Sequence, residues 1–126
     1  MHDAHFQFES GSLPTQEFHL DERVAEWLFA QKFWAEINAE VSSHFDQYEQ
    51  DCADVRMSSI ICSRLQRLCR ELDSACPVVT FVRGWQSNGT PIEVSLDGVV
   101  LRDQLRTLRD FFCRAVEQNT TVVCDL

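Results

Sequence analysis

The chain contains neither glycine nor proline from Thr15 to Cys76. Because these two residues are the commonest helix breakers, a gap of this length favours helical structure. Asp21 can cap a helix that begins at Glu22, where an acidic side chain suits the helix dipole. Apolar residues then recur at steps of three, four and seven, which predicts one long amphipathic helix from residue 21 toward residue 50. The repeating residues are Val24, Trp27, Ala30, Trp34, Ile37, Val41, Phe45, Tyr48 and Cys52.

A polar segment over residues 50–58 predicts a break before a second helix over about 58–75. Ile61, Leu65 and Leu68 share one face of this second helix, and Pro77 ends it. The two helices are expected to form an antiparallel hairpin.

The character of the sequence changes after Pro77, where β-branched and alternating segments replace the helical pattern. The dipeptide Asp97-Gly98 is typical of a tight turn between two strands. The expected elements are strands over residues 77–83, 92–96 and 99–101, a helix over 102–118 and a final strand over 120–126. The final strand could insert beside the first.

These elements predict an α+β fold in the order (β)ααβββαβ, in which the leading strand contains the alternating Phe6 and Phe8. Three or four short, mostly antiparallel strands would form one sheet with helices on one face. A chain of 126 residues with 44% hydrophobic content fits a single domain over residues 1–126. Its parts would be an arm (1–20), a helical hairpin (21–75) and a ββαβ part (77–126).

The net charge is −9, and it is unevenly distributed. Residues 1–55 hold twelve acids and two bases, a net −10, whereas residues 56–126 hold eight acids and nine arginines, a net +1. This balance opposes binding to nucleic acid and to anionic membranes. No run of 18 apolar residues predicts a transmembrane helix, and no signal-peptide pattern precedes the fold, so a cytoplasmic location is expected.

Six cysteines are present, and the absence of a secretory signal favours their reduced form. Cys62, Cys69 and Cys76 recur every seven residues and would lie on one helix face as small core residues. No C-x-x-C pair occurs, and the four histidines are not at ligand spacing from any cysteine. The sequence therefore predicts no metal site and no cofactor.

Signals of catalysis are weak. None of the common nucleotide-binding, hydrolase or zinc-protease motifs is present, and the paired carboxylates lie on what should be a solvated helix face. Arg102, Arg106 and Arg109 could contact phosphates, but Asp103 and Asp110 interrupt them, so solvated or internally paired arginines are expected. We therefore expect no catalytic residues and no enzyme activity.

The first predicted helix carries a second stripe beside its core face, at spacings of four and three residues. This acidic stripe consists of Glu22, Glu26, Phe29, Phe33, Glu36 and Glu40. Either the sheet or the N-terminal arm covers its two phenylalanines, or they form aromatic anchors within a charged rim, which is typical of a protein-binding site. Trp85, in a turn-rich segment, is a second candidate contact residue.

A small acidic domain without catalytic motifs is similar in physical profile to bacterial toxin-immunity proteins and antitoxins, although no motif identifies such a family. The profile predicts stoichiometric occlusion of a basic, nuclease-like partner by the acidic stripe. One alternative is a secretion-type chaperone that holds a client on apolar patches, and another is a small cysteine-dependent enzyme. The sequence leaves open whether the protein is a monomer or a homodimer.

Overall fold

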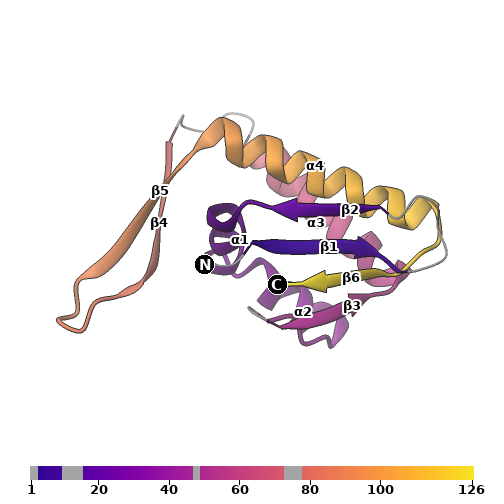
Figure 1. The fold of residues 1–126 in the computed structure, drawn as a ribbon, viewed down its shortest axis with the longest axis horizontal. Coiled ribbons are helices and arrows are strands. Elements are labelled where there is room, and N and C mark those ends of the chain that lie inside the picture. The colour runs from indigo at the N-terminus through magenta and orange to yellow at the C-terminus, as the bar shows by residue number, and fades with distance from the viewer. Residues whose placement is uncertain (1–2, 10–15, 47–48, 73–77) are drawn as a thin grey trace.

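The computed structural model describes residues 3–9, 16–46, 49–72 and 78–126 and has the predicted α+β architecture (Figure 1). In chain order its elements are β1 (Ala4–Phe8), β2 (Glu17–Leu20), α1 (Glu22–Ala30), α2 (Phe33–Val41), β3 (Gln50–Ala53), α3 (Val55–Leu72), β4 (Val78–Trp85), β5 (Pro91–Asp97), α4 (Gly98–Glu117) and β6 (Val122–Asp125). The predicted element order is matched in outline. The strands β2 and β3 are additions that the sequence pattern did not predict.

An antiparallel four-stranded sheet forms one side of the molecule, with strand order β2-β1-β6-β3 (Figure 1). The final strand, β6, pairs with β1 on one side and with β3 on the other, which confirms its expected insertion beside the first strand. Side chains alternate between the two faces, as the pleat requires. Phe6 and Phe8 of β1 and Val122 of β6 are buried, whereas Gln7 is exposed on the opposite face.

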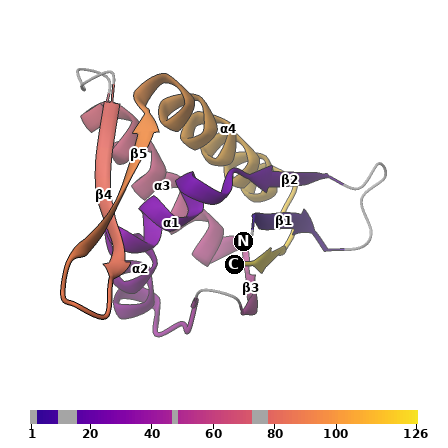
Figure 2. The ribbon, with the colours of Figure 1, turned by 60° about the vertical axis from the view of Figure 1, so that its left-hand side comes forward.

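The helices α3 and α4 pack along each other on the inner face of this sheet (Figures 1 and 2). Ring contacts dock α4 on β1: Phe111 lies 4.7 Å from Phe8, and Phe112 lies 5.6 Å from Phe6, measured between ring centroids. The helices predicted over residues 21–50 and 58–75 were expected to pack together as a hairpin. In the structure α3, which corresponds to the second of them, packs chiefly against α4.

The helix α4 begins earlier than the sequence pattern predicted. Asp97 accepts hydrogen bonds from the backbone N–H groups of Val99 and Val100, at 2.8 Å and 3.3 Å, and so caps the helix. The predicted strand over residues 99–101 is therefore wrong, because Asp97-Gly98 starts a helix instead of closing a hairpin turn.

The predicted long first helix is also wrong, since it divides into α1 and α2 at Lys32. Lys32 adopts a left-handed backbone conformation, with φ of 62°, which ends the regular helical geometry. Phe33 and Trp34 follow the break as the first two residues of α2, where successive side chains still point about 100° apart. In the structure both are buried, and their rings meet edge to face at 5.1 Å. The break changes the direction of α2 relative to α1, and Trp27 of α1 is buried together with Phe33 and Trp34 of α2.

The helix α2 ends at Val41, well before residue 50, because Asn38 holds the following loop against it. The Asn38 carboxamide donates to the carbonyl of Phe45 and accepts from the Phe45 backbone N–H and from the Ser43 hydroxyl, at 2.7–2.8 Å. This loop returns Phe45 to the core, where its ring lies 5.2 Å from Trp34. Tyr48, which the pattern assigned to the helix, lies outside the described residues.

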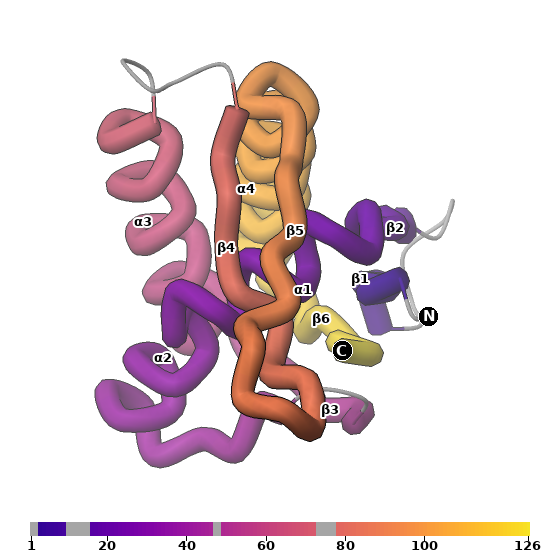
Figure 3. The backbone as a smooth tube through the Cα atoms, turned by 90° about the vertical axis from the view of Figure 1, so that its left-hand side faces the viewer, coloured from indigo at the N-terminus to yellow at the C-terminus, as the bar shows by residue number. Residues whose placement is uncertain are grey.

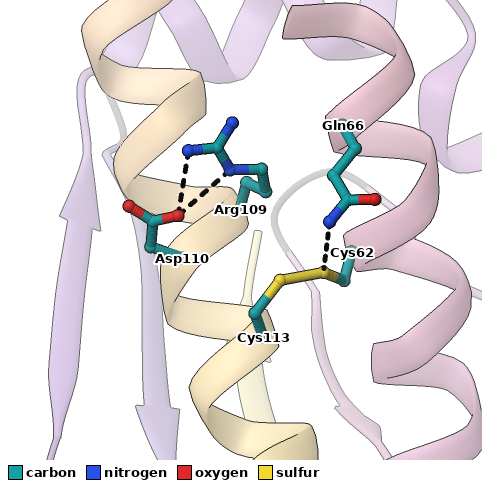
Figure 4. Close-up of a disulfide and its surroundings, with 5 residues drawn as sticks. All are labelled: Cys62, Gln66, Arg109, Asp110 and Cys113. Atoms are coloured by element: carbon teal, nitrogen blue, oxygen red, sulfur yellow. Dashed lines mark hydrogen bonds and ion pairs between the residues drawn. A yellow bond between two sulfur atoms is a disulfide. The ribbon is translucent and has the colours of Figure 1, made fainter.

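A disulfide joins Cys62 of α3 to Cys113 of α4, with the two Cα atoms 5.8 Å apart (Figure 4). The expectation that the cysteines are reduced is therefore wrong for this pair. The Gln66 amide donates to the Cys62 sulfur at 3.8 Å. Cys69 is buried, as predicted for a small core residue, and Cys76 lies outside the described residues.

The strands β4 and β5 form a separate two-stranded hairpin. It packs against α1 and against the start of α4, and its turn points away from the four-stranded sheet (Figures 1 and 3). None of the helices in the described ranges is long and apolar enough to cross a membrane.

Candidate functional site

Three of the four glutamates in the acidic stripe pair with arginines of the same chain. Glu26 of α1 accepts a hydrogen bond of 2.5 Å from Arg83 of β4, and its side chain is only 14% exposed. Glu36 and Glu40 of α2 both bind Arg64 of α3, at 3.1 Å and 2.7 Å. The first pair joins α1 to strand β4, and the other two join α2 to α3. Because their charge is partly neutralised within the chain, these glutamates are weaker anchors for a basic partner than their spacing indicated.

Glu22, the fourth glutamate of the stripe, lies in the first turn of α1. Desolvation raises the pKa of Glu22, and the neighbouring Glu26 carboxylate raises it further, while the Arg83 guanidinium acts in the opposite direction. The Glu22 carboxyl therefore keeps its proton to a higher pH than an isolated glutamate does.

The two phenylalanines of the stripe differ in exposure. Phe33 is 4% exposed and is a core residue, so it presents almost no surface to a partner. Phe29 is half-buried, with its ring 6.5 Å from Trp34. Its exposed edge lines a hollow of about 400 Å³, together with Lys32, Asn38 and other residues of the loop after α2. Phe29 therefore remains accessible, whereas Phe33 does not.

Trp85 lies at the end of β4 and is 68% exposed, the largest exposed fraction among the large hydrophobic side chains of the described residues. Two more apolar side chains of the same strand are exposed, Val78 at 57% and Val82 at 40%. Of the residues predicted from sequence as contacts, Trp85 is thus the one that the structure leaves most accessible.

Cross-strand pairing places these three side chains on one face of the hairpin. Val78 is opposite Asp97 and Val82 is opposite Glu93, and both partners point to the same side of β5 because they are separated by an even number of residues. An irregularity between Val82 and Gly84 shifts the register by one residue. Trp85 consequently faces Pro91, on the same side as Glu93. We call Val78, Val82 and Trp85 the hairpin patch.

The opposite face of the hairpin attaches it to the body of the protein. Phe81 and Leu96 on that face are buried, and Val79 and Val94 are half-buried. The pair between Arg83 and Glu26 adds a polar contact to α1. The hairpin patch is therefore displayed on a supported strand pair, with its outer face turned away from α1 and α4.

Carboxylates border the hairpin patch. Glu93 stands directly across from Val82 and is exposed, and Asp97 stands across from Val78 at the cap of α4. On the side toward α1, an open hollow of about 390 Å³ is lined by Arg23, Arg83, Glu93 and adjoining residues of β5. The patch thus combines apolar side chains with an acidic border on β5.

The described cysteines offer little support for a nucleophilic thiol. Cys62 and Cys113 are joined in the disulfide. Burial raises the pKa of the Cys124 thiol far above its usual range, which keeps that sulfur protonated and unreactive. Cys52 is exposed on β3, at the edge of the sheet.

Sequence reasoning missed Val78 and Val82 as exposed residues. Both faces of the segment 78–82 are apolar, and such a run is typical of a strand that is buried on both sides. In the structure only one face of this strand is covered.

A comparison of this chain with family models, with curated proteins and with solved structures finds no match.

Proposed function

We propose that this protein binds a basic partner protein and blocks it, with the hairpin patch as the principal contact. The observation that supports this proposal is the exposure of Val78, Val82 and Trp85 on one face of a hairpin whose other face is packed on the body. Aromatic anchors dominate the binding energy of protein interfaces, and tryptophan is among the most enriched of them. Val82 is the apolar neighbour nearest to Trp85 on this face, and Thr80 separates it from Val78.

Charge supports a basic partner. The chain carries a net charge of −9, and Glu93 lies on the same hairpin face as the patch, whereas the carboxylate of Asp97 is engaged in capping α4. Acidic groups at the border of an apolar contact accelerate association with a basic surface and repel acidic competitors. Glu26, Glu36 and Glu40 are already paired with arginines of the same chain. We therefore place the proposed contact on the hairpin and not on the acidic stripe.

A protein of this kind acts by occupying a surface and needs no catalytic step, metal or cofactor for that action. Bacterial toxin-immunity proteins and antitoxins are similar in physical profile, and a nuclease-like toxin with a cationic active site is the class of partner that we infer. A cytoplasmic location is part of this proposal, although disulfides such as Cys62–Cys113 are rarer there than in oxidising compartments. The proposal treats the protein as a binding protein and not as an enzyme.

One observation favours a second candidate, a chaperone for an extended client segment. Within the described residues, β4 and β5 pair with each other and with no third strand. An open strand edge can take up an extended peptide by main-chain hydrogen bonds. A chaperone would bind an unfolded segment at this edge, whereas an immunity-type protein would bind a folded partner with the patch.

The partner can be identified by placing a photo-reactive phenylalanine analogue at position 85 and irradiating cells that express the protein. The matched control carries the same analogue at Thr107, an exposed position on α4. We expect one dominant adduct with a basic protein from position 85 and not from position 107. Absence of an adduct from position 85, or the same adducts from both positions, would contradict the proposal.

The purified partner then separates the two candidates. A folded basic partner should bind in a one-to-one complex whose association rate falls steeply with ionic strength. The substitution Glu93→Lys should lower that rate without changing the fold, because it reverses a charge at the border of the patch. Binding only to an unfolded fragment of the partner, with no dependence on salt, would favour the chaperone.

A further inference from the structure

The outer face of the four-stranded sheet brings two histidines and a glutamate together on β1 and β2. His5 of β1 is paired directly with His19 of β2, and Gln7 is paired with Glu17. Since residues two apart point to the same side of a strand, the side chains of His5, Glu17 and His19 share one face. It is the face opposite the buried Phe6 and Leu20, so the three side chains stand on the solvent side.

The three side chains lie close to one another. His5 Nε2 lies 3.2 Å from a carboxylate oxygen of Glu17. The imidazole rings of His5 and His19 are stacked, with centroids 4.3 Å apart and planes inclined by 17°. One ligand atom from each of the three residues lies within 4.8 Å of the others. The cluster therefore offers two nitrogens and one oxygen on a common side.

One of these distances matches the coordination shell of zinc. Zinc binds imidazole nitrogen and carboxylate oxygen at about 2.0–2.2 Å, so two ligands of a tetrahedral ion lie roughly 3.3 Å apart. The separation between His5 and Glu17 already has this value in a hydrogen bond, whose proton the ion would replace. The terminal torsions of histidine and glutamate are broad, so the remaining adjustment needs only side-chain rotation.

We propose that His5, Glu17 and His19 form a binding site for Zn²⁺ or a similar divalent transition-metal ion. Imidazole ligands select this class over Mg²⁺ and Ca²⁺, which prefer oxygen ligands throughout. Two neutral imidazoles and one carboxylate supply three ligands, and the exposed face leaves the fourth position to water. Asp125 of β6 is paired with His5 on its other side and adds negative charge next to the site.

The site links the first two strands of the sheet. An ion that binds only the folded protein raises the free energy of unfolding. Once its concentration exceeds the dissociation constant, this increase grows with the logarithm of the ratio of the two. Zn²⁺ would therefore strengthen the pairing of β1 with β2, the strand at the edge of the sheet. This site lies on a different element from the hairpin patch, so the proposal is independent of the proposed function.

Calorimetric titration of the full chain with ZnCl₂ in a non-chelating buffer tests the site, with Co²⁺ absorption as a second readout of coordination. We expect one equivalent of Zn²⁺ to bind and thermal stability to rise with its concentration. His19→Ala removes a ligand at an exposed position and should weaken binding by at least about tenfold, the lower range of effects seen for groups that merely support a ligand. Glu17→Gln should weaken it in the same direction.

Two control variants locate the ion. His44→Ala removes an exposed histidine of the loop after α2, and Cys52→Ser removes the exposed thiol. Both should bind Zn²⁺ as the wild type does. The proposal is overturned if the wild type binds no Zn²⁺, if His19→Ala and Glu17→Gln bind as tightly as the wild type, or if Cys52→Ser abolishes binding.

Discussion

The disulfide between α3 and α4 should make a large contribution to stability. Cys62 and Cys113 are 51 residues apart in the sequence, so their bond closes a loop that includes the hairpin and most of both helices. The entropy that such a cross-link removes from the unfolded chain corresponds to about 4 kcal/mol at 25 °C. Native disulfides of small domains commonly contribute about 2–5 kcal/mol, so a value of this size is expected here.

Urea denaturation of the oxidised and the reduced chain measures this contribution. We expect reduction to lower the free energy of unfolding by about 2–4 kcal/mol. The variant Cys113→Ser should resemble the reduced wild type, and the reductant should not change its unfolding curve. Thiol titration of the unfolded chain should detect at least two additional thiols after reduction.

The reasoning would be refuted if the reductant left the unfolding curve of the wild type unchanged. It would be refuted equally if the reductant shifted the curve of Cys113→Ser by as much as that of the wild type, because the effect would then not come from this bond.

Two local features give further predictions. Asn38→Ala removes three hydrogen bonds to Ser43 and Phe45. In a urea titration it should lower the free energy of unfolding by about 2–3 kcal/mol. A smaller loss than that caused by Ser43→Ala would contradict the role of Asn38 in holding the loop. The pKa of Glu22, measured by carboxyl NMR, should lie above the usual glutamate value and should fall in Glu26→Gln. Because folding raises this pKa, the contribution of Glu22 to stability is full below its unfolded pKa and is lost as pH rises through its folded pKa. A Glu22 pKa at or below the usual value would contradict the proposed environment.

The elements that the sequence predicted well are those whose pattern is local. The alternation of Phe6 with Phe8 predicted a strand, and the apolar repeat through Leu105 and Phe112 predicted a helix. Each pattern records which face meets the core, and it can be read without knowing the partner element. The α+β class followed from these local patterns.

The features that the sequence did not predict depend on distant contacts. Lys32 has no sequence signal for a left-handed conformation, yet the helix breaks there and α2 packs in a different direction from α1. The strands β2 and β3 have four residues each, too few to show a period, and pairing with β1 and β6 defines them. The disulfide forms because α3 and α4 pack together, and the spacing of the cysteines in the sequence does not predict that packing.

The candidate site was predictable only in part. Trp85 was recognisable as an aromatic residue in a turn-rich segment, and its exposure follows from its place at the end of a hairpin. The engagement of Glu26, Glu36 and Glu40 could not be predicted, because their arginine partners lie 57, 28 and 24 residues away in the sequence. Helix periodicity identifies which acids share a face but not which basic residue another element brings to it.

The affinity of the cross-linked partner for Trp85→Ala tests the central claim most directly. Trp85 is exposed, so its truncation should leave the fold intact, as circular dichroism can verify. We predict that it weakens binding by at least about 2 kcal/mol, or roughly thirtyfold, as for an anchor residue at an interface, whereas Thr107→Ala leaves affinity unchanged. An affinity of Trp85→Ala within twofold of the wild type, or a larger loss in Phe29→Ala, would contradict the hairpin patch as the binding surface.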